Sequence, residues 1–288
     1  MASSMTFAAA TRAALQHALR DDDVLLVGDG VGCPGSSTEG LEGAVRALPA
    51  ADRGIVGVAL GMALAGKRVV VELPSARHLS AVSELLTEAG RLGATEHGPH
   101  LVVRVPYGEE LAALDAPLSR AMVSAPGVAV WCAASPQQEA GLLLAALRRR
   151  GATVLLSPRS LQAHRGDVSL EAVPAEPRTV RSGHHVTLAA WGAGVIAAEH
   201  AADVLHAEGI SAEVIDLVSL LPLPTQALSA SVQRTGRLVV AHPHDDVWAD
   251  QVRAVGLHGA FLHLESPLAQ VPAEPAPIAR AARDAVFY

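Results

Sequence analysis

The sequence predicts an α/β protein made of two domains, each built around a parallel β-sheet. Its 288 residues are too many for one small module and enough for two domains of ordinary size. Hydrophobic residues make up 50% and charged residues 18%, a balance that excludes a disordered chain. Short apolar runs alternate with segments of helical periodicity, a pattern typical of strands buried between layers of helices.

The first half begins with helical spacing over Thr6–Leu19, followed by the apolar run Val24–Val27, which glycines close. Similar spacing predicts further helices at Thr38–Leu48, Gly54–Ala65, Leu79–Leu92 and Ser135–Arg149. The runs between them predict strands at Val69–Leu73, Leu101–Val105, Val128–Trp131 and Thr153–Leu156.

The alternation lapses between Pro158 and Gly183, where prolines and scattered charges indicate a crossover between domains. We therefore expect a first domain over 1–160, a linker over 161–182 and a second domain over 183–288. The second domain is expected to be another parallel α/β layer, with strands at Val186–Ala190, Ala212–Ile215 and Arg237–Ala241 and helices at Val195–Ala207, Thr225–Gln233, Val247–Leu257 and Pro277–Val286.

Charge and composition exclude several classes of partner. The formal net charge is −7, and the only cluster of Lys and Arg is Arg148–Arg150, so nucleic acid is not expected as a partner. No apolar run reaches the roughly 18 to 20 residues that span a bilayer, and Met1–Thr11 lacks the pattern of a signal peptide, so we expect no membrane partner and a cytoplasmic location. With only Cys33 and Cys132 present, a disulfide is not expected.

A glycine-rich loop follows the strand predicted at Val24–Val27. Gly30–Gly35 matches G-x-G-x-x-G, and Asp52 stands at the spacing of a ribose-binding acid. However, Ala44–Ala51 contains Pro49 and is interpreted as a helix end and a turn, so no strand would deliver Asp52 to a ribose. A dinucleotide site is therefore disfavoured.

The start of that loop, Gly28-Asp29-Gly30, also resembles the opening of the thiamine diphosphate Mg²⁺ motif, in which an Asn follows further along the chain. This sequence contains no Asn at all. The chain cannot complete the metal and diphosphate half of such a site in its usual form. The alternative is that the glycines only turn the chain sharply after a buried strand.

A second motif, His242-Pro243-His244-Asp245-Asp246, follows the strand predicted at Arg237–Ala241. His-x-His-x-Asp after a strand opens several hydrolytic metal sites, so a metal-dependent hydrolase using His242, His244 and Asp246 is an alternative function. The other interpretations are a solvated loop in which Asp246 caps the following helix, or a role at an interface.

The segment from Leu48 to Glu72 reads LPAADRGIVGVALGMALAGKRVVVE. It resembles, without a gap, the run PISEAGIVGAAVGAALAGxxPVVE of the β subunits of 2-oxo acid dehydrogenase decarboxylating components. Further matching segments follow in order and cover most of the chain: Val102–Gly108, Ala125–Val128, Ser135–Pro136, Gly141–Leu143, Gly209–Leu217, Leu221–Leu223 and Arg234–His242. The resemblance implies a transketolase-type pyrimidine-binding domain followed by a transketolase C-terminal domain.

It also implies a two-component enzyme that decarboxylates a 2-oxo acid and passes the product unit to an acceptor, or joins it to one as a carboligase. Thiamine diphosphate would be shared with an α subunit, implied to form α₂β₂, that carries the Gly-Asp-Gly and Asn motif and binds most of the Mg²⁺. No metal is assigned to this chain. The remaining alternative is a catalytically silent assembly or regulatory subunit.

The ungapped alignment places Asp52 where the family has its critical Glu. That carboxyl group is hydrogen-bonded to ring nitrogen N1′ and promotes the tautomer that removes the thiazolium C2 proton. Asp is one methylene shorter than Glu, and it is also a favoured residue at a helix start, so capping of the helix Gly54–Ala65 is an alternative role.

Other pocket residues also depart from the family. Arg77 and His78 replace its aromatic residues beside the pyrimidine, and Asp29 and Tyr107 are further candidates for cofactor binding. The family's Gln-His-Ser segment is Leu114-Asp115-Ala116, so its active-site histidine is lost.

Overall fold

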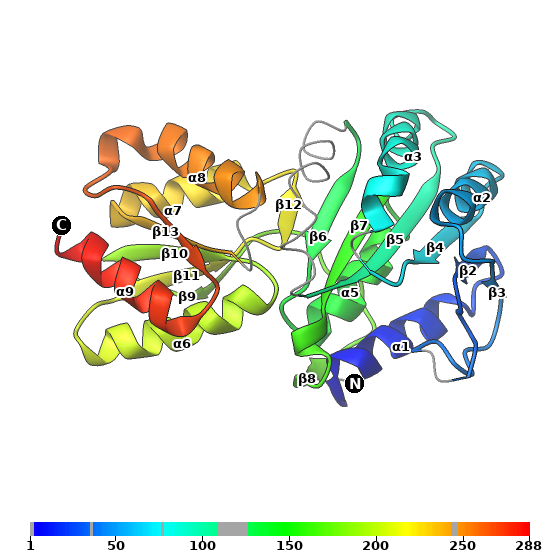
Figure 1. The fold of residues 1–288 in the computed structure, drawn as a ribbon, viewed down its shortest axis with the longest axis horizontal. Coiled ribbons are helices and arrows are strands. Elements are labelled where there is room, and N and C mark those ends of the chain that lie inside the picture. The colour runs from blue at the N-terminus through cyan, green and yellow to red at the C-terminus, as the bar shows by residue number, and fades with distance from the viewer. Residues whose placement is uncertain (1–2, 35–36, 76–77, 109–125, 243–246) are drawn as a thin grey trace. The chain divides into compact units, whose positions relative to one another are not determined.

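The computed structural model describes residues 3–34, 37–75, 78–108, 126–242 and 247–288 (Figure 1). The chain divides into two compact units, Met1–Ala175 and Glu176–Tyr288. Each unit has a β-sheet with helices on both faces, so the predicted α/β class is confirmed. Among these described residues, no helix has both the length and the apolar character needed to cross a membrane.

The main sheet of the first unit has parallel strands in the order β6-β7-β5-β4-β2-β3. Their bounds are β2 (Val24–Gly28), β3 (Val45–Ala47), β4 (Arg68–Glu72), β5 (His100–Tyr107), β6 (Ala129–Cys132) and β7 (Gly151–Pro158). Nearly continuous runs of Val and Leu make the central strands buried on both faces. Because the strands are parallel, their carboxyl ends meet at one edge, where Glu72 is in register with Arg104.

Helices cover both faces of this sheet (Figure 1). On one face, α1 (Phe7–Ala18) packs against α5 (Pro136–Ala146), and on the other α2 (Asp52–Leu64) packs against α3 (Leu79–Leu92). Thr6 and Ser135 cap the N-termini of α1 and α5, because their side-chain oxygens accept hydrogen bonds from the backbone N–H groups of Ala9 and Gln138. A 3₁₀ turn (Arg159–Leu161) follows β7, and β1 (Ser3–Thr6) pairs with β8 (Arg165–Val168).

The second unit has the strand order β14-β13-β10-β11-β9. Its elements are β9 (Arg178–Arg181), β10 (Val186–Ala190), α6 (Ala193–Ala207), β11 (Ala212–Asp216), β12 (Ser219–Leu221), α7 (Thr225–Thr235), β13 (Leu238–His242), α8 (Val247–Ala260), a 3₁₀ turn (Phe261–His263), β14 (Ala269–Pro272) and α9 (Pro275–Val286). Helices α6 and α9 pack together on one face and α7 and α8 on the other. The sheet is parallel, as expected, through β14, β13, β10 and β11, and only its edge strand β9 runs antiparallel, to β11.

The prediction of a helix over Thr38–Leu48 is wrong. Gly40 and Gly43 take φ values of 66° and 110°, which a right-handed helix does not allow, and the Leu19 carbonyl oxygen lies 2.8 Å from where a Cβ on Gly43 would be. The segment contains turns and then the short strand β3, so a strand does precede Asp52. The described residues of the loop after β2 nevertheless contain no helix, whereas a dinucleotide site requires this loop to lead directly into one.

The segment expected to form a linker, 161–182, contains strands at both ends. β8 pairs with β1 in the first unit, and β9 joins the sheet of the second. The division between the units falls between Ala175 and Glu176.

Gly28 at the end of β2 is a position where the structure requires glycine. A Cβ there would lie 2.6 Å from the Glu72 carbonyl oxygen and 2.8 Å from Cγ1 of Val31. We expect Gly28→Ala to lower the free energy of unfolding by about 1 to 3 kcal/mol, because the backbone of β4 would have to shift to make room for the Cβ. Urea denaturation measures this change. The matched control is Gly61→Ala within α2, where a Cβ meets nothing within 4 Å. If the two variants have the same free energy of unfolding, close packing around Gly28 is not what requires a glycine there.

Candidate functional site

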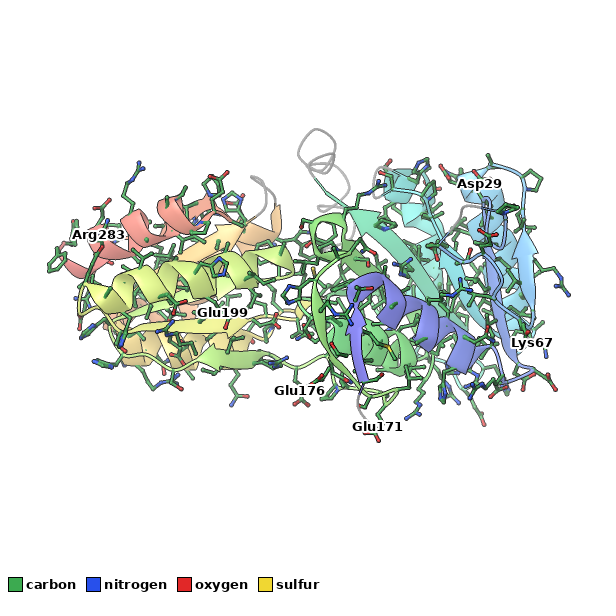
Figure 2. The ribbon with its side chains drawn as sticks, turned by 90° about the horizontal axis from the view of Figure 1, so that it is seen from below. Asp29, Lys67, Glu171, Glu176, Glu199 and Arg283 are labelled. Atoms are coloured by element: carbon green, nitrogen blue, oxygen red, sulfur yellow. The ribbon has the colours of Figure 1, made fainter. Side chains whose placement is uncertain are left out.

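A cavity of about 360 Å³ opens at the carboxyl edge of the first unit's sheet. Its walls come from the loop after β2, the ends of β4 and β5, and the turn after β7, and they include Asp29, Ser37, Glu72, Arg104 and Arg159. The exposed side chain of Asp29, labelled in Figure 2, belongs to this loop. Ligands of open α/β sheets bind beyond the carboxyl ends of strands, so this edge is the natural place for a site.

Arg104 is a largely buried residue of this cavity wall and holds two carboxylates together. Its Nη1 donates to Oε1 of Glu72 at 2.6 Å, and its Nε donates to Oε1 of Glu139 at 3.1 Å. The hydroxyls of Thr11 and Ser157 donate to the same Glu139 oxygen at 2.9 and 2.8 Å. The network therefore ties β4, β5 and β7 to α1 and α5 just inside the carboxyl edge.

The charge balance of this network explains how an arginine is tolerated there. Burial by itself lowers the pKa of the Arg104 guanidinium, but Glu72 and Glu139 outweigh burial and raise that pKa above its usual value. Oε2 of Glu72 is buried, and the described residues offer it no hydrogen-bond partner.

Asp52 and His78 form a second polar pair on the α2 and α3 side of the sheet. Nδ1 of His78 lies 2.7 Å from Oδ2 of Asp52, and the two side chains are 23% and 27% exposed. Asp52 is the first residue of α2, and His78 directly precedes α3. The packing of these helices against each other brings the two residues together.

Asp52 does not act as a side-chain cap of α2. The helix begins at Asp52 itself, with Ala51 at the capping position and no side-chain hydrogen bond to the first turn. A negative charge in the first turn is still favoured by the helix dipole. Among the described residues, the hydrogen bond of this carboxylate is with His78 and not with the backbone of its own helix.

The other predicted residues lie in different places. Tyr107 is buried at the end of β5, with its hydroxyl 3.2 Å from Sγ of Cys132, and it does not line the cavity. Arg77 lies outside the described residues. The structure thus brings Asp52 and His78 into contact, places Asp29 on the cavity wall and buries Tyr107 beside a cysteine.

The alternative metal motif begins at His242, which is buried at the end of β13. His244 and Asp246 lie outside the described residues. Within the part of the chain that the structure describes, no three or more His, Cys, Asp or Glu side chains are grouped so that they could hold a metal ion.

Sequence reasoning assigned no role to the buried network of Arg104, Glu72 and Glu139. A usable signal was present, since Glu72 and Arg104 are charged residues within or at the end of otherwise apolar strands. Neighbouring parallel strands place such residues side by side, as Glu72 and Arg104 are here.

Comparisons with known families agree with this architecture. Residues 3–163 match the model of the transketolase pyrimidine binding domain, and residues 175–287 match that of the transketolase C-terminal domain. A solved structure, a split gene transketolase described as an inactive β4 tetramer, has a TM-score of 0.80 at 17% identity and covers 99% of both chains. The fold is therefore that of a two-domain protein of the transketolase type.

Sequence relatives narrow this class. The β subunit of the pyruvate dehydrogenase E1 component of Staphylococcus epidermidis is 34% identical, over 93% of this chain and 90% of the relative. The mitochondrial 2-oxoisovalerate dehydrogenase subunit beta 2 of Arabidopsis thaliana is 31% identical, over 93% of this chain and 81% of the relative. The chain belongs to the family of β subunits of 2-oxo acid dehydrogenase E1 components, which confirms the resemblance read from Leu48–Glu72.

Proposed function

We propose that this chain is the β subunit of a two-component thiamine diphosphate enzyme that decarboxylates a 2-oxo acid and transfers the product unit to an acceptor. The observation that carries the proposal is the carboxylate of Asp52, held at the start of α2 at the position where the family has its critical Glu. Family membership supports the reaction class. A carboligase, which joins the same unit to a second carbonyl compound, is the variant within this class.

The residues present fit the pyrimidine half of this cofactor. Its ring nitrogen N1′ requires a carboxyl group that holds or shares a proton, and Asp52 is a part-exposed carboxylate. Oδ2 is bonded to His78, and Asp52 makes no other side-chain hydrogen bond to the described residues. Oδ1 is therefore the oxygen offered to a ring nitrogen.

The diphosphate half is assigned to a partner. The sequence contains no Asn, so the usual Gly-Asp-Gly and Asn set for Mg²⁺ cannot be completed here. We propose an α subunit that supplies those ligands, in an α₂β₂ assembly. Asp29 on the cavity wall and Arg77 are kept as candidate contacts of this chain, whereas the buried Tyr107 would support the pocket from behind.

Thiamine diphosphate, when bound, supplies the nucleophilic carbon and the electron sink for decarboxylation. The protein's own contribution is to hold the proton at N1′ through Asp52 and to orient that carboxylate through His78. Each of these roles consists of positioning and polarisation.

The test is to purify the assembly from its native host through a tag on this chain, with Mg²⁺ present. We expect about one thiamine diphosphate per chain, a co-purified α subunit and turnover of at least one compound in a panel of 2-oxo acids, because the pocket is completed between chains. Cofactor content is measured by chromatography of the acid extract. An assembly that retains the α subunit yet holds no cofactor contradicts the proposal and favours the silent assembly subunit.

A further inference from the structure

The contact between Asp52 and His78 joins residues that lie 26 positions apart in the sequence. An ionised carboxylate only accepts hydrogen bonds, so Nδ1 of His78 carries the proton that lies between them. The distance of 2.7 Å is that of a strong hydrogen bond with a charged acceptor. Both side chains are about three-quarters buried, so bulk water competes less for this bond than it does for an exposed pair.

The pair joins the starts of two neighbouring helices. Asp52 is the first residue of α2, where the backbone N–H of Ile55 donates to the Ala51 carbonyl at 2.8 Å. His78 directly precedes α3, and its backbone N–H donates to the Ser75 carbonyl at 3.1 Å. Because α2 and α3 pack against each other, the two side chains meet where these helices begin.

Both residues of this pair differ from the residues that the family has at the corresponding positions. Asp52 is one methylene shorter than the family's Glu, and His78 stands in the segment where the family has aromatic residues. A shorter carboxylate that is displaced by about 1 Å can cost on the order of a hundredfold in rate. A donor that fixes the orientation of the short carboxylate offsets part of that loss.

We propose that His78 is a positioning residue that holds Oδ2 of Asp52 and so aims Oδ1 at N1′ of the cofactor ring. This inference rests on the proposed function. In this chain the Asp52 and His78 pair takes the place of the family's Glu and aromatic side chain. His78 acts through Asp52 and has no assigned contact with the reacting atoms.

Two substitutions of His78 separate its hydrogen bond from its bulk. His78→Phe removes the donor, whereas His78→Asn keeps an N–H at the same number of bonds from Cα as Nδ1. In the assembled α and β complex we expect His78→Phe to slow exchange of the C2 proton of bound thiamine diphosphate by about tenfold to a hundredfold, since the carboxylate loses its orientation. In His78→Asn, the rate of C2 proton exchange is expected to stay within about threefold of that of the unsubstituted complex. Exchange is followed by quenched-flow proton NMR in D₂O.

Affinity provides a readout besides catalysis. The Kd for thiamine diphosphate, from titration calorimetry with Mg²⁺, is expected to change less than about threefold in both variants, because most of the binding comes from the diphosphate half. The double variant Asp52→Glu with His78→Phe rebuilds the family pair and is expected to recover the rate of C2 proton exchange. If the two substitutions acted independently, the second would not restore the rate lost in His78→Phe. Normal exchange in His78→Phe, or an equal loss in His78→Asn, overturns the inference.

A further measurement needs no cofactor. In the ¹⁵N-histidine-labelled complex, the His78 signal, assigned by its loss in His78→Asn, is expected to show a proton on Nδ1. A ring protonated only at Nε2 overturns the inference. A complex that binds no thiamine diphosphate overturns the proposed function and the role of His78 with it, whereas normal binding with unaltered exchange in His78→Phe overturns the inference alone.

Discussion

Replacing Asp52 with alanine is expected to lower kcat of the assembled α and β complex by at least about a hundredfold, the effect of removing a positioned acid or base. The carboxylate is the group this chain offers to hold a proton at N1′, and alanine has none. Among the residues that the structure describes, the Asp52 side chain is hydrogen-bonded only to His78, so the fold and the assembly should remain intact. Steady-state turnover and size-exclusion chromatography measure the two properties separately.

Two further variants make this result specific. Asp52→Asn keeps the shape of the side chain but cannot take the proton, so it should lose as much turnover as alanine. Arg53→Gln changes the next residue on α2, whose exposed pair with Glu84 touches no part of the site, and it should leave turnover unchanged. Full turnover in Asp52→Ala would show that Asp52 has no part in the reaction.

The elements that the sequence predicted well are those with strong periodicity. The helix expected at Leu79–Leu92 and the strand expected at Val186–Ala190 have these bounds in the structure. The failures lie where backbone conformation decides instead of pattern. Thr38–Leu48 has helical spacing, but the left-handed glycines Gly40 and Gly43 prevent a helix. The edge strand β3 has only three residues, and the edge strand β9 reads RTVR, so neither contains the apolar run by which the other strands were predicted.

At the candidate site, the sequence indicated residues but not their contacts. Alignment placed Asp52 and His78 near the cofactor, yet only the packing of α2 on α3 brings His78 to the Asp52 carboxylate. Tyr107 shows the opposite case, because its position at a strand end indicated a pocket residue while its side chain turns toward Cys132. Side-chain direction at a strand end depends on the neighbouring elements, which no local pattern records.

The buried network has a different relation to function from that of the Asp52 pair. Arg104 lies on the face covered by α1 and α5, and Asp52 on the face covered by α2 and α3. Glu72, at the end of β4, belongs to the buried network and also lines the cavity. The network therefore connects the stability of the first unit to the wall of this cavity.

Arg104→Met is expected to lower the free energy of unfolding by about 3 to 5 kcal/mol, because Glu72 and Glu139 would remain buried without their shared cation. Urea denaturation followed by circular dichroism measures this loss. The compensated variant, Arg104→Met with Glu72→Gln and Glu139→Gln, should regain part of it, since neutral amides remove the unpaired charges. The reference is Arg237→Met, whose partner Glu265 is 60% exposed and whose ion pair should contribute less than that of Arg104. If Arg104→Met unfolds within about 1 kcal/mol of the unsubstituted chain, the guanidinium is not what holds the carboxyl edge together.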